Sequence, residues 1–484
     1  MTIDRLRREF VDLLGRDGVI SEGPQLRTYE CDGLTGYRVR PALVVLPTTT
    51  AQVADVVRAC RRDQVPFVAR GSGTGLSGGA LPHADGVLIV LARMRSILHI
   101  DVENRYLVAE PGVTNAAISA AVAGHDLYYA PDPSSQIVCS IGGNVAENSG
   151  GVHCLKYGFT TNHVLGLEFV TADGDVVDLG GPVTDTPGYD LRGVVVGSEG
   201  TLGIVTKVAV RLLRRPEAVQ TLLADFDTPR QAGDAVAAIT SAGIIPAGME
   251  MMDRLAIQAC EEDAKVGLNL QCGAVLVVEL DGPRAEVEAR FLEVQEHCRT
   301  AGALNIRIAE DAAERALIWK GRKAAFAAMG RLSRDYFVQD GVIPRTRLGE
   351  VLERIDQMSE ETGYRVANVF HAGDGNLHPL VLYDGRRPGE AEEAEALSIR
   401  IVELCVESGG SITGEHGVGA DKACSMPKMF GKDDIALMER VRTAFDPAGL
   451  CNPGKLFPTP RLCGERPGPY RPHPLEEAGI AERM

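Results

Sequence analysis

The chain has 484 residues, a formal net charge of −16 and a composition (45% hydrophobic, 24% charged) that is ordinary for a globular protein. Since one domain usually takes ~100–200 residues, we expect two or three domains. The negative charge excludes a nucleic-acid partner, because binding to nucleic acid needs clustered Lys and Arg.

The sequence carries no sign of secretion or of a membrane span. Its first ten residues mix both charges and lack the apolar stretch of a signal peptide. No uncharged apolar run reaches the ~18 residues that a membrane-spanning helix needs. The 11 cysteines are irregularly spaced without a C-x-x-C pair, which predicts reduced thiols and excludes an iron–sulfur cluster of the usual spacing. We therefore expect a cytoplasmic protein that is peripheral to a membrane only through a partner.

The first part of the chain reads as a helix followed by a strand–helix–strand unit. Apolar residues recur at helical spacing over residues 3–15. Pro47 and three threonines then precede a second helix, which places Val53 and Cys60 on one apolar face. The buried strands of the unit are expected at residues 42–46, 67–69 and 87–91.

Beyond residue 101 the pattern is that of an α+β protein. Short apolar runs alternate with turns up to about residue 213, for example at residues 107–109, 167–171, 176–177 and 194–196, and Asp173-Gly174-Asp175 predicts a hairpin turn. The sequence pattern changes at Arg214-Arg215-Pro216, which predicts a boundary to a second α+β domain. That domain is expected to contain helices at residues 231–241, 284–301, 313–329 and 390–408, and strands at 274–280, 366–370 and 379–383.

A glycine-rich loop follows the second strand of the strand–helix–strand unit. Residues 71–79 hold five glycines and three hydroxyl side chains. Backbone N–H groups in such a loop can meet a pyrophosphate, since glycine permits φ > 0 and has no Cβ to block the approach. The spacing fits neither the P-loop nor the dinucleotide fingerprint, and a strand follows where that fingerprint needs a helix. Taken alone, the loop is equally compatible with a flexible surface segment.

Further clusters of glycine, serine and asparagine accompany this loop. Amide and hydroxyl side chains can hydrogen-bond the edge of a flavin ring, while glycines let the ring lie against the chain. The clusters lie at residues 131–135, 140–151, 156–158 and 197–203.

Two of the ten histidines lie close together in the second domain. His371 and His378 flank a glycine-containing turn between two predicted strands, so a hairpin would bring both rings to the same end. Glu415 could add a carboxylate, and two imidazoles with one carboxylate leave open positions on a catalytic metal. This donor set suits Zn²⁺, Mn²⁺ or Fe²⁺. The remaining histidines are interpreted as core or surface residues or given no role, except His416 beside Glu415.

On these motifs the sequence resembles the vanillyl-alcohol oxidase/PCMH flavoprotein family. The residues that carry the likeness are 70–79, 131–135, 140–151 and 197–204, and the later motifs narrow it to the branch of D-lactate dehydrogenase, D-2-hydroxyglutarate dehydrogenase and the corresponding flavoprotein of glycolate oxidase. The resemblance implies an α+β fold with a two-subdomain FAD-binding PCMH-type domain, an α+β substrate (cap) domain and a C-terminal segment that returns to the flavin. The corresponding boundaries are an N-terminal helical segment at 1–40, the FAD-binding domain at 41–215, the cap domain at 216–430, the C-terminal segment at 431–458 and a tail at 459–484.

The resemblance also implies FAD as cofactor. In this family the first loop cradles the pyrophosphate and the second cluster meets the isoalloxazine ring; because the first loop lacks the histidine that some members link to FAD, we expect non-covalent FAD. In the C-terminal segment, Asn452 and Lys455 are candidates to touch FAD, although a helix stop followed by a turn explains them nearly as well. The positions carried over to FAD binding are Arg70, Gly71, Ser72, Gly73, Thr74, Gly75, Ser77, Gly78, Pro131, Ser134, Ser140, Gly142, Gly143, Asn144, Asn148, Gly150, Gly151, Tyr157, Gly158, Glu199, Gly203, Ile204 and Asn452.

The same resemblance implies the chemistry. Relatives bind zinc or a similar divalent ion at the positions of His371, His378 and Glu415, so Zn²⁺ is favoured, with Mn²⁺ and Fe²⁺ as alternatives. A metal that chelates the hydroxyl and carboxylate of a 2-hydroxy acid would lower the pKa of that hydroxyl. His416 is the candidate base that takes its proton as hydride leaves for the flavin, with a structural hydrogen bond as the alternative. Arg322 matches the arginine that binds the substrate carboxylate, and Lys320 and Lys323 are expected to face solvent.

Three apolar positions favour a small substrate. The hydroxyglutarate enzymes hold a second carboxylate with polar side chains where this chain has Phe326, Val338 and Leu380. Apolar groups would leave that carboxylate unpaired, which is costly. We therefore expect glycolate or D-lactate as substrate, with D-2-hydroxyglutarate as the alternative.

The chain supplies no cluster ligands, so the electrons need an external acceptor. Glycolate-oxidising relatives work with an FAD-containing companion and an iron–sulfur subunit; a homodimer is also compatible with the sequence. Two other classes share the fold: a non-redox FAD enzyme that makes ether lipids, and a non-catalytic FAD-holding subunit of a complex.

Overall fold

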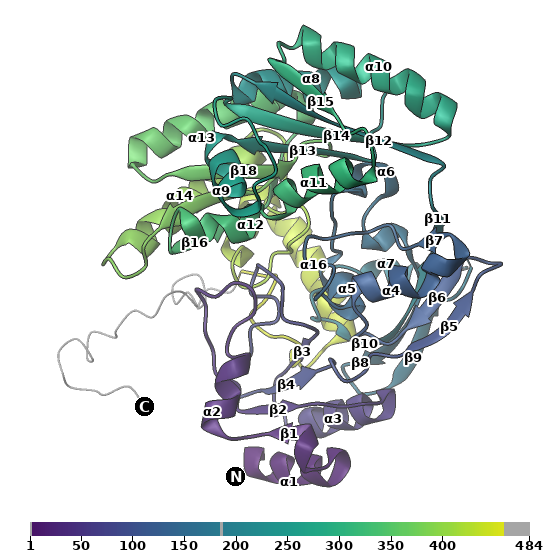
Figure 1. The fold of residues 1–484 in the computed structure, drawn as a ribbon. Helices are drawn as coiled ribbons and strands as arrows, with labels where there is room; N and C mark the ends of the chain where they lie inside the picture. The colour runs from purple at the N-terminus through teal and green to yellow at the C-terminus, as the bar shows by residue number, and fades with distance from the viewer. Residues whose placement is uncertain (1, 184–186, 459–484) are drawn as a thin grey trace.

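The computed structural model describes residues 2–183 and 187–458, and its strands form separate sheets in two halves (Figure 1). The purple and blue half holds the chain up to Arg214, and the teal and green half holds most of the rest. The mixture of helices with antiparallel and parallel strands confirms the α+β class.

The N-terminal sheet has the strand order β1-β2-β4-β3. Strands β2 and β3 both run parallel to β4, and α3 connects them, as the strand–helix–strand pattern predicts. Helix α3 begins where Thr49 Oγ1 accepts a hydrogen bond from the Gln52 N–H at 3.2 Å. Leu6 and Phe10 of α1 are fully buried in the same hydrophobic cluster. The elements are α1 (Thr2–Leu14), β1 (Val19–Ile20), β2 (Leu43–Val45), α3 (Thr50–Arg62), β3 (Phe67–Arg70) and β4 (Val87–Val90).

The second sheet, with the order β5-β6-β10-β8-β9, is antiparallel. Gly174, at φ +85°, forms the turn of the predicted hairpin between β8 and β9. The apolar run at 194–196 covers the end of α7 and the residue after it. Asp190 caps the start of that helix, where its Oδ1 accepts a hydrogen bond from the Gly193 N–H at 3.0 Å. The elements are β5 (Ile97–Asp101), β6 (Tyr106–Ala109), α4 (Asn115–Val122), α5 (Ile141–Glu147), β8 (Val164–Thr171), β9 (Val176–Gly180), α7 (Leu191–Val195) and β10 (Gly203–Arg211).

A large sheet dominates the other half, and helices cover both of its faces (Figure 1). Its central strand β14 is therefore a continuous apolar run rather than an alternating one. The helices on one face are α8 (Pro229–Ser241), α10 (Arg284–Thr300) and α13 (Leu348–Thr362), and those on the other are α9 (Arg254–Ala264), α11 (Ala312–Lys323) and α12 (Ala325–Ala328). The strands are β12 (Ala218–Phe226), β13 (Gly248–Asp253), β14 (Ala274–Gly282), β15 (Asn305–Ile308), β16 (Asp335–Val338), β17 (Gly341–Val342), β18 (Val366–His371), β19 (Asn376–Leu377) and β20 (Pro379–Tyr383).

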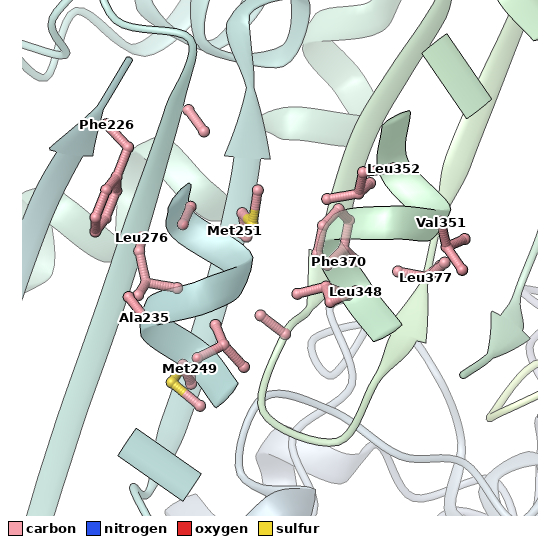
Figure 2. Packing of buried hydrophobic residues seen from close by; sticks show 14 of the residues in the cluster. Phe226, Ala235, Met249, Met251, Leu276, Leu348, Val351, Leu352, Phe370 and Leu377 are labelled. Carbon is pink, nitrogen blue, oxygen red and sulfur yellow. The ribbon is translucent and has the colours of Figure 1, made fainter. Parts of the chain in front are cut away.

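Side chains from alternate strand positions fill the core under α8, α10 and α13. Figure 2 shows Phe226, Met251, Leu276 and Phe370 projecting from neighbouring strands toward the helices that pack on them. All four are at most 1% exposed. Because successive strand side chains point to opposite faces, Glu250, between the buried Met249 and Met251, points away from this core.

One predicted helix differs from the structure. The helix expected over residues 313–329 is divided at Ala324 into α11 and α12, and a short 3₁₀ turn follows. The Ala324 N–H still donates to the Lys320 carbonyl at 3.1 Å and Ala324 keeps a right-handed helical conformation, so the two segments form one interrupted helical run.

The C-terminal part of the described chain returns to the first half. Helix α16 (Lys432–Phe445), drawn in yellow, leads from the green half to the purple and blue sheets (Figure 1). Phe445 packs edge-on against Phe169 with ring centroids 6.4 Å apart, and Cys451 pairs with Phe67 as an isolated bridge. The tail predicted at 459–484 lies outside the described residues. The chain passes from the first half to the large sheet between Arg214 and Ala218; the domain boundaries given above remain predictions.

Two bulk features of the described residues concern their helices and their cysteines. None of their helices is long and apolar enough to cross a bilayer. Nine cysteines in the described ranges carry free thiols, and eight of these are buried.

Candidate active site

A cavity of about 420 Å³ is formed by the glycine-rich segments of the first half and closed by α11, α12 and Glu415–His416 from the other half. This volume is within the range of small-molecule sites. The residues predicted to bind the cofactor that do line this cavity are Arg70, Gly71, Ser72, Gly73, Thr74, Gly75, Ser134, Ser140, Gly142, Gly143, Asn144, Glu199, Gly203 and Ile204.

Close backbone approach explains the glycines at the centre of the cavity. A Cβ on Gly71 would lie 2.2 Å from Ser140 Oγ, so two segments of the cofactor pattern meet there. Gly73 has φ +71°, a conformation that L side chains rarely adopt. Gly142 and Gly143 lie in the first turn of α5, and a Cβ on Gly142 would lie 2.6 Å from Pro111 Cβ.

Other predicted cofactor residues do not line this cavity. Tyr157 donates its hydroxyl to Asp281 Oδ2 at 2.7 Å, across to β14. Asn452 Nδ2 donates to the carbonyls of Gly79 (2.8 Å) and Glu199 (2.7 Å), so the C-terminal segment braces the cavity wall from behind. The full set outside the lining is Ser77, Gly78, Pro131, Asn148, Gly150, Gly151, Tyr157, Gly158 and Asn452; Lys455 is outside it as well and donates to the Leu81 carbonyl at 2.8 Å.

Two buried carboxyl groups line the cavity where it approaches the second half. Burial and the neighbouring Glu199 raise the pKa of Glu147 well above its ordinary value. Glu199 is itself raised in pKa by burial, and it accepts hydrogen bonds from the N–H groups of Val418 (2.7 Å) and Gly419 (2.6 Å). Glu199 therefore ties the loop that carries Glu415 and His416 to the first half. Glu199 was predicted from the sequence but Glu147 was not, since its only signal is its place within the cluster at 140–151.

The predicted metal ligands come together beside this cavity, which Glu415 lines and His371 and His378 do not. His371 is the last residue of β18, and β19 and β20 pair antiparallel with that strand. The centroids of the His371 and His378 rings are therefore only 5.2 Å apart. Glu415 Oε1 is 3.2 Å from His371 Nε2 and 3.4 Å from His378 Nε2. One ligand atom from each of the three lies within 4.8 Å of the others. His416, on the same loop, stacks on His378 with ring centroids 4.9 Å apart and an interplanar angle of 7°.

These residues fit a cation. The His378 side chain is 1% exposed; its Nε2 lies 3.4 Å from both Asp340 Oδ1 and Glu415 Oε1, and its Nδ1 has no hydrogen-bond partner among the described residues. A buried ring nitrogen that has only contacts of 3.4 Å is poorly satisfied, and a metal ion at Nε2 would satisfy it. Burial opposes the charge of His371, but Glu250 and Glu415 outweigh it and raise its pKa well above the ordinary value. Conversely, the histidines overcome the effect of burial and lower the pKa of Glu415 to about 2.

A second acid, Asp340, holds the loop that carries Glu415. Its Oδ2 accepts from the N–H groups of Gly414 and His416, both at 2.9 Å, and its Oδ1 accepts from the Glu415 N–H at 3.2 Å. Burial raises the pKa of Asp340, but His416 and Lys422 reverse this and leave it well below the ordinary value. Asp340, His378 and His416 also form a second group with metal-ligand spacing. Asp340 was not predicted from the sequence, where its only signal is an acid between two short apolar runs.

Arg322 and the apolar positions lie around the histidines. Arg322 is 2% exposed and does not line the cavity; its Nη2 is 2.6 Å from Glu250 Oε2. Lys323 is exposed, as expected, and lies at the edge of the cavity. The Phe326 ring is 5.8 Å from that of His378. Val338 pairs directly with Leu380 across β16 and β20, and both pack in the same cluster as Phe326.

His153, to which the sequence assigned no role, connects the two halves. Its Nδ1 is 3.0 Å from Asp132 Oδ1, and its Nε2 is 3.5 Å from Glu279 Oε1 on β14. Burial lowers the pKa of His153, but the two carboxylates prevail and raise it to about 10. Thr221 and Trp319 each donate to Glu279 Oε2 at 2.6 Å, so this junction is a fully bonded ionic cluster outside the metal group.

Comparisons with known proteins define the class first. A model of the FAD binding domain matches residues 41–180, and a model of the C-terminal domain of FAD linked oxidases matches residues 215–456. The chain belongs to the family of FAD-linked oxidases with a PCMH-type FAD-binding domain, and it is an FAD-linked oxidoreductase. This confirms the family resemblance.

Individual relatives cover nearly the whole chain. Glycolate oxidase subunit GlcD of Escherichia coli K12 is 52% identical, over 92% of this chain and 90% of its own length, and that of Bacillus subtilis is 37% identical, over 93% and 96%. A D-lactate dehydrogenase of Anaerostipes hadrus is 31% identical, over 87% of this chain and 90% of its own. Among solved structures, p-cresol methylhydroxylase has the same fold with a TM-score of 0.79 at 18% identity, covering 94% of this chain and 96% of its own.

Proposed function

We propose that this chain oxidises a small D-2-hydroxy acid, such as glycolate or D-lactate, to the 2-oxo acid. The observation that carries the proposal is that Glu415 and His416 line the same cavity as the glycine-rich loop, so a substrate at the metal group would lie against the flavin. The relatives support it, since those described above are named glycolate oxidase subunits and D-lactate dehydrogenase.

FAD would be held by the loop at 71–75, by the first turn of α5 and by the turn at 198–204. When bound, FAD supplies a two-electron acceptor at its ring. The backbone N–H groups of the glycine loop would hold its negatively charged phosphates.

A divalent metal, with Zn²⁺ favoured, would be held by His371, His378 and Glu415. When bound, such an ion draws electron density from the hydroxyl and carboxylate of a chelating substrate. Asp340 keeps Glu415 in place through its backbone, and the apolar ring of Phe326 shields His378 from water.

Proton removal falls to His416. Burial lowers its pKa to about 4, so the ring is neutral near pH 7 and can accept the proton of the substrate hydroxyl. Arg322 would bind the substrate carboxylate, since its Nε is buried without a hydrogen-bond acceptor among the described residues.

The main experiment follows the flavin band near ~450 nm anaerobically. Protein loaded with FAD and Zn²⁺ or Mn²⁺ receives D-lactate, L-lactate, glycolate and D-2-hydroxyglutarate in turn. We expect bleaching with D-lactate or glycolate and its loss when a chelator removes the metal. If none of the four acids bleaches the flavin while FAD and metal are bound, the proposed function is wrong.

Substrate size gives a second expected result. Because Phe326, Val338 and Leu380 offer nothing to a distal carboxylate, an unpaired charge there should cost about 1–3 kcal/mol, or roughly 5–150-fold in kcat/KM. We therefore expect kcat/KM for D-2-hydroxyglutarate to be lower than for D-lactate by that factor, and Phe326→Thr to narrow the gap. A higher kcat/KM for D-2-hydroxyglutarate in the unaltered protein contradicts this.

The attachment of FAD can be tested without substrate. Since residues 71–79 contain no histidine, we expect acid precipitation to leave a yellow, fluorescent supernatant and a colourless pellet. As a control, a second sample is heated before the acid step, so that cofactor trapped without a covalent bond is released. Flavin fluorescence that stays with the washed pellet would show a covalent bond.

The electron acceptor is proposed to be a protein partner. The two GlcD relatives are named subunits of glycolate oxidase, which supports companion subunits, such as an iron–sulfur protein and a second flavoprotein, for this chain. Attachment to a membrane would then come through those partners.

A further inference from the structure

A buried carboxylate, Glu250, lies between two groups of the candidate active site. Its Oε1 is 2.6 Å from His371 Nδ1, and its Oε2 is 2.6 Å from Arg322 Nη2. The Glu250 side chain is completely buried, and those of His371 and Arg322 are 6% and 3% exposed. Nothing in the reaction outlined above uses Glu250.

The strand pairing explains why Glu250 reaches His371. The two residues are directly opposite each other in the antiparallel ladder of β13 and β18. Side chains at such positions are on the same face of the sheet with Cβ atoms about 5 Å apart. The neighbours Met249 and Met251 point to the other face and fill the hydrophobic core (Figure 2). The register that buries the two methionines therefore also fixes Glu250 beside the histidine.

We infer that Glu250 is a positioning residue that orients His371 toward the metal and Arg322 toward the substrate carboxylate; this rests on the proposed function. A hydrogen bond from Nδ1–H to Oε1 leaves Nε2 with its lone pair free, and Nε2 is the atom that faces Glu415. A carboxylate behind a ligating histidine fixes the ring tautomer and increases the basicity of the ligand. The second oxygen holds one arm of the Arg322 guanidinium, and its remaining N–H groups stay available.

Only a carboxylate satisfies both neighbours. The His371 Nδ1–H and the Arg322 guanidinium are donors, so both oxygens of Glu250 must accept. In Glu250→Gln one of the two positions becomes an NH₂ group, which would face a donor. Glu250→Gln therefore preserves size and breaks one of the two contacts, whichever way the amide turns.

The test measures metal affinity, with no need for turnover. The FAD-loaded protein is titrated with Zn²⁺ in competition with a chromophoric chelator, and the Kd is compared between the unaltered protein and Glu250→Gln. We expect the variant to bind Zn²⁺ about 10–100-fold more weakly, as for other residues behind metal ligands. An unchanged Kd overturns the inference.

A matched control is available on the adjacent strand. Glu279 of β14 is also a buried carboxylate beside a histidine, His153, but neither belongs to the metal group. Glu279→Gln is expected to keep the Zn²⁺ affinity of the unaltered protein. An equal loss in both variants means that any buried carboxylate on this sheet has the same effect, which also overturns the inference.

A measurement on the unaltered protein covers the case in which Glu250→Gln does not fold. With ¹⁵N-labelled histidine, the Zn²⁺-loaded protein should show His371 protonated at Nδ1 and metal-bound at Nε2, with the signal assigned by its loss in His371→Asn. Metal bound through Nδ1 contradicts the role of Glu250. If the unaltered protein binds no Zn²⁺, the proposed metal site itself fails, and this inference fails with it; that outcome differs from a normal Kd that Glu250→Gln leaves unchanged.

Discussion

His378→Ala, saturated with FAD and supplied with Zn²⁺, is expected to remain yellow and to lose substrate-driven flavin reduction. His378 is one of three candidate ligands, and its buried Nε2 has only the 3.4 Å contacts to Asp340 and Glu415 in the described chain. Losing the metal removes several kcal/mol of charge stabilisation from the transition state; about 4 kcal/mol would correspond to roughly a thousandfold in rate. The rate constant of anaerobic flavin bleaching by D-lactate or glycolate, measured by stopped flow, checks this.

The metal content separates this effect from a loss of fold. We expect His378→Ala to retain FAD at one equivalent while elemental analysis finds no tightly bound metal. His99→Ala serves as the control, because His99 lies on strand β5 away from the cavity and its ring contacts Tyr106. A His378→Ala protein that bleaches at the rate of the unaltered protein would exclude a catalytic metal at this site.

His416→Asn is expected to lower the rate of flavin reduction by about 10²–10⁴-fold, the usual contribution of a general base. Unlike His378→Ala, this variant should retain its metal, since His416 is adjacent to the three candidate ligands without belonging to that group. KM should change far less than kcat, because the proton is transferred in the transition state. Stopped-flow reduction together with metal analysis measures both quantities.

The pH dependence tests the same assignment with a definite sign. Burial lowers the pKa of His416 to about 4, so the neutral, accepting form persists from pH 8 down to about pH 5, and the rate should decline only as the pH approaches 4. Histidine with its ordinary pKa of about 6.5 would instead halve the rate near that pH. An inflection near pH 6.5 that is absent in His416→Asn would contradict a depressed pKa.

Local sequence patterns predicted most of the elements correctly. The strand–helix–strand unit at the start, the hairpin at Gly174 and the strands of the large sheet were visible because burial on one or both faces leaves a periodic signal. The pattern at 313–329 predicted the extent of the helical run but not its interruption at Ala324, since the apolar spacing continues through that residue.

Part of the candidate site could be predicted because its residues form chemical patterns that are local in sequence. Glycine clusters mark close backbone approach, and two histidines seven residues apart on a predicted hairpin mark a shared end, so both signals are local in sequence. The metal group at His371, His378 and Glu415 could therefore be nominated before the fold was known.

What the sequence alone determined is the class of protein, the glycine-rich cofactor segments and the identity of the candidate ligands, because those depend on residue types at short spacing. Only the tertiary structure decided which side chains support them. Glu250 is 121 residues from His371, and Asp340 is 75 from Glu415; both contacts arise from strand pairing and burial, which no local pattern specifies. The same packing turned Tyr157 and Asn452 away from the cavity and paired Arg322 with Glu250, since a buried polar group must bond whichever partner the fold brings near it.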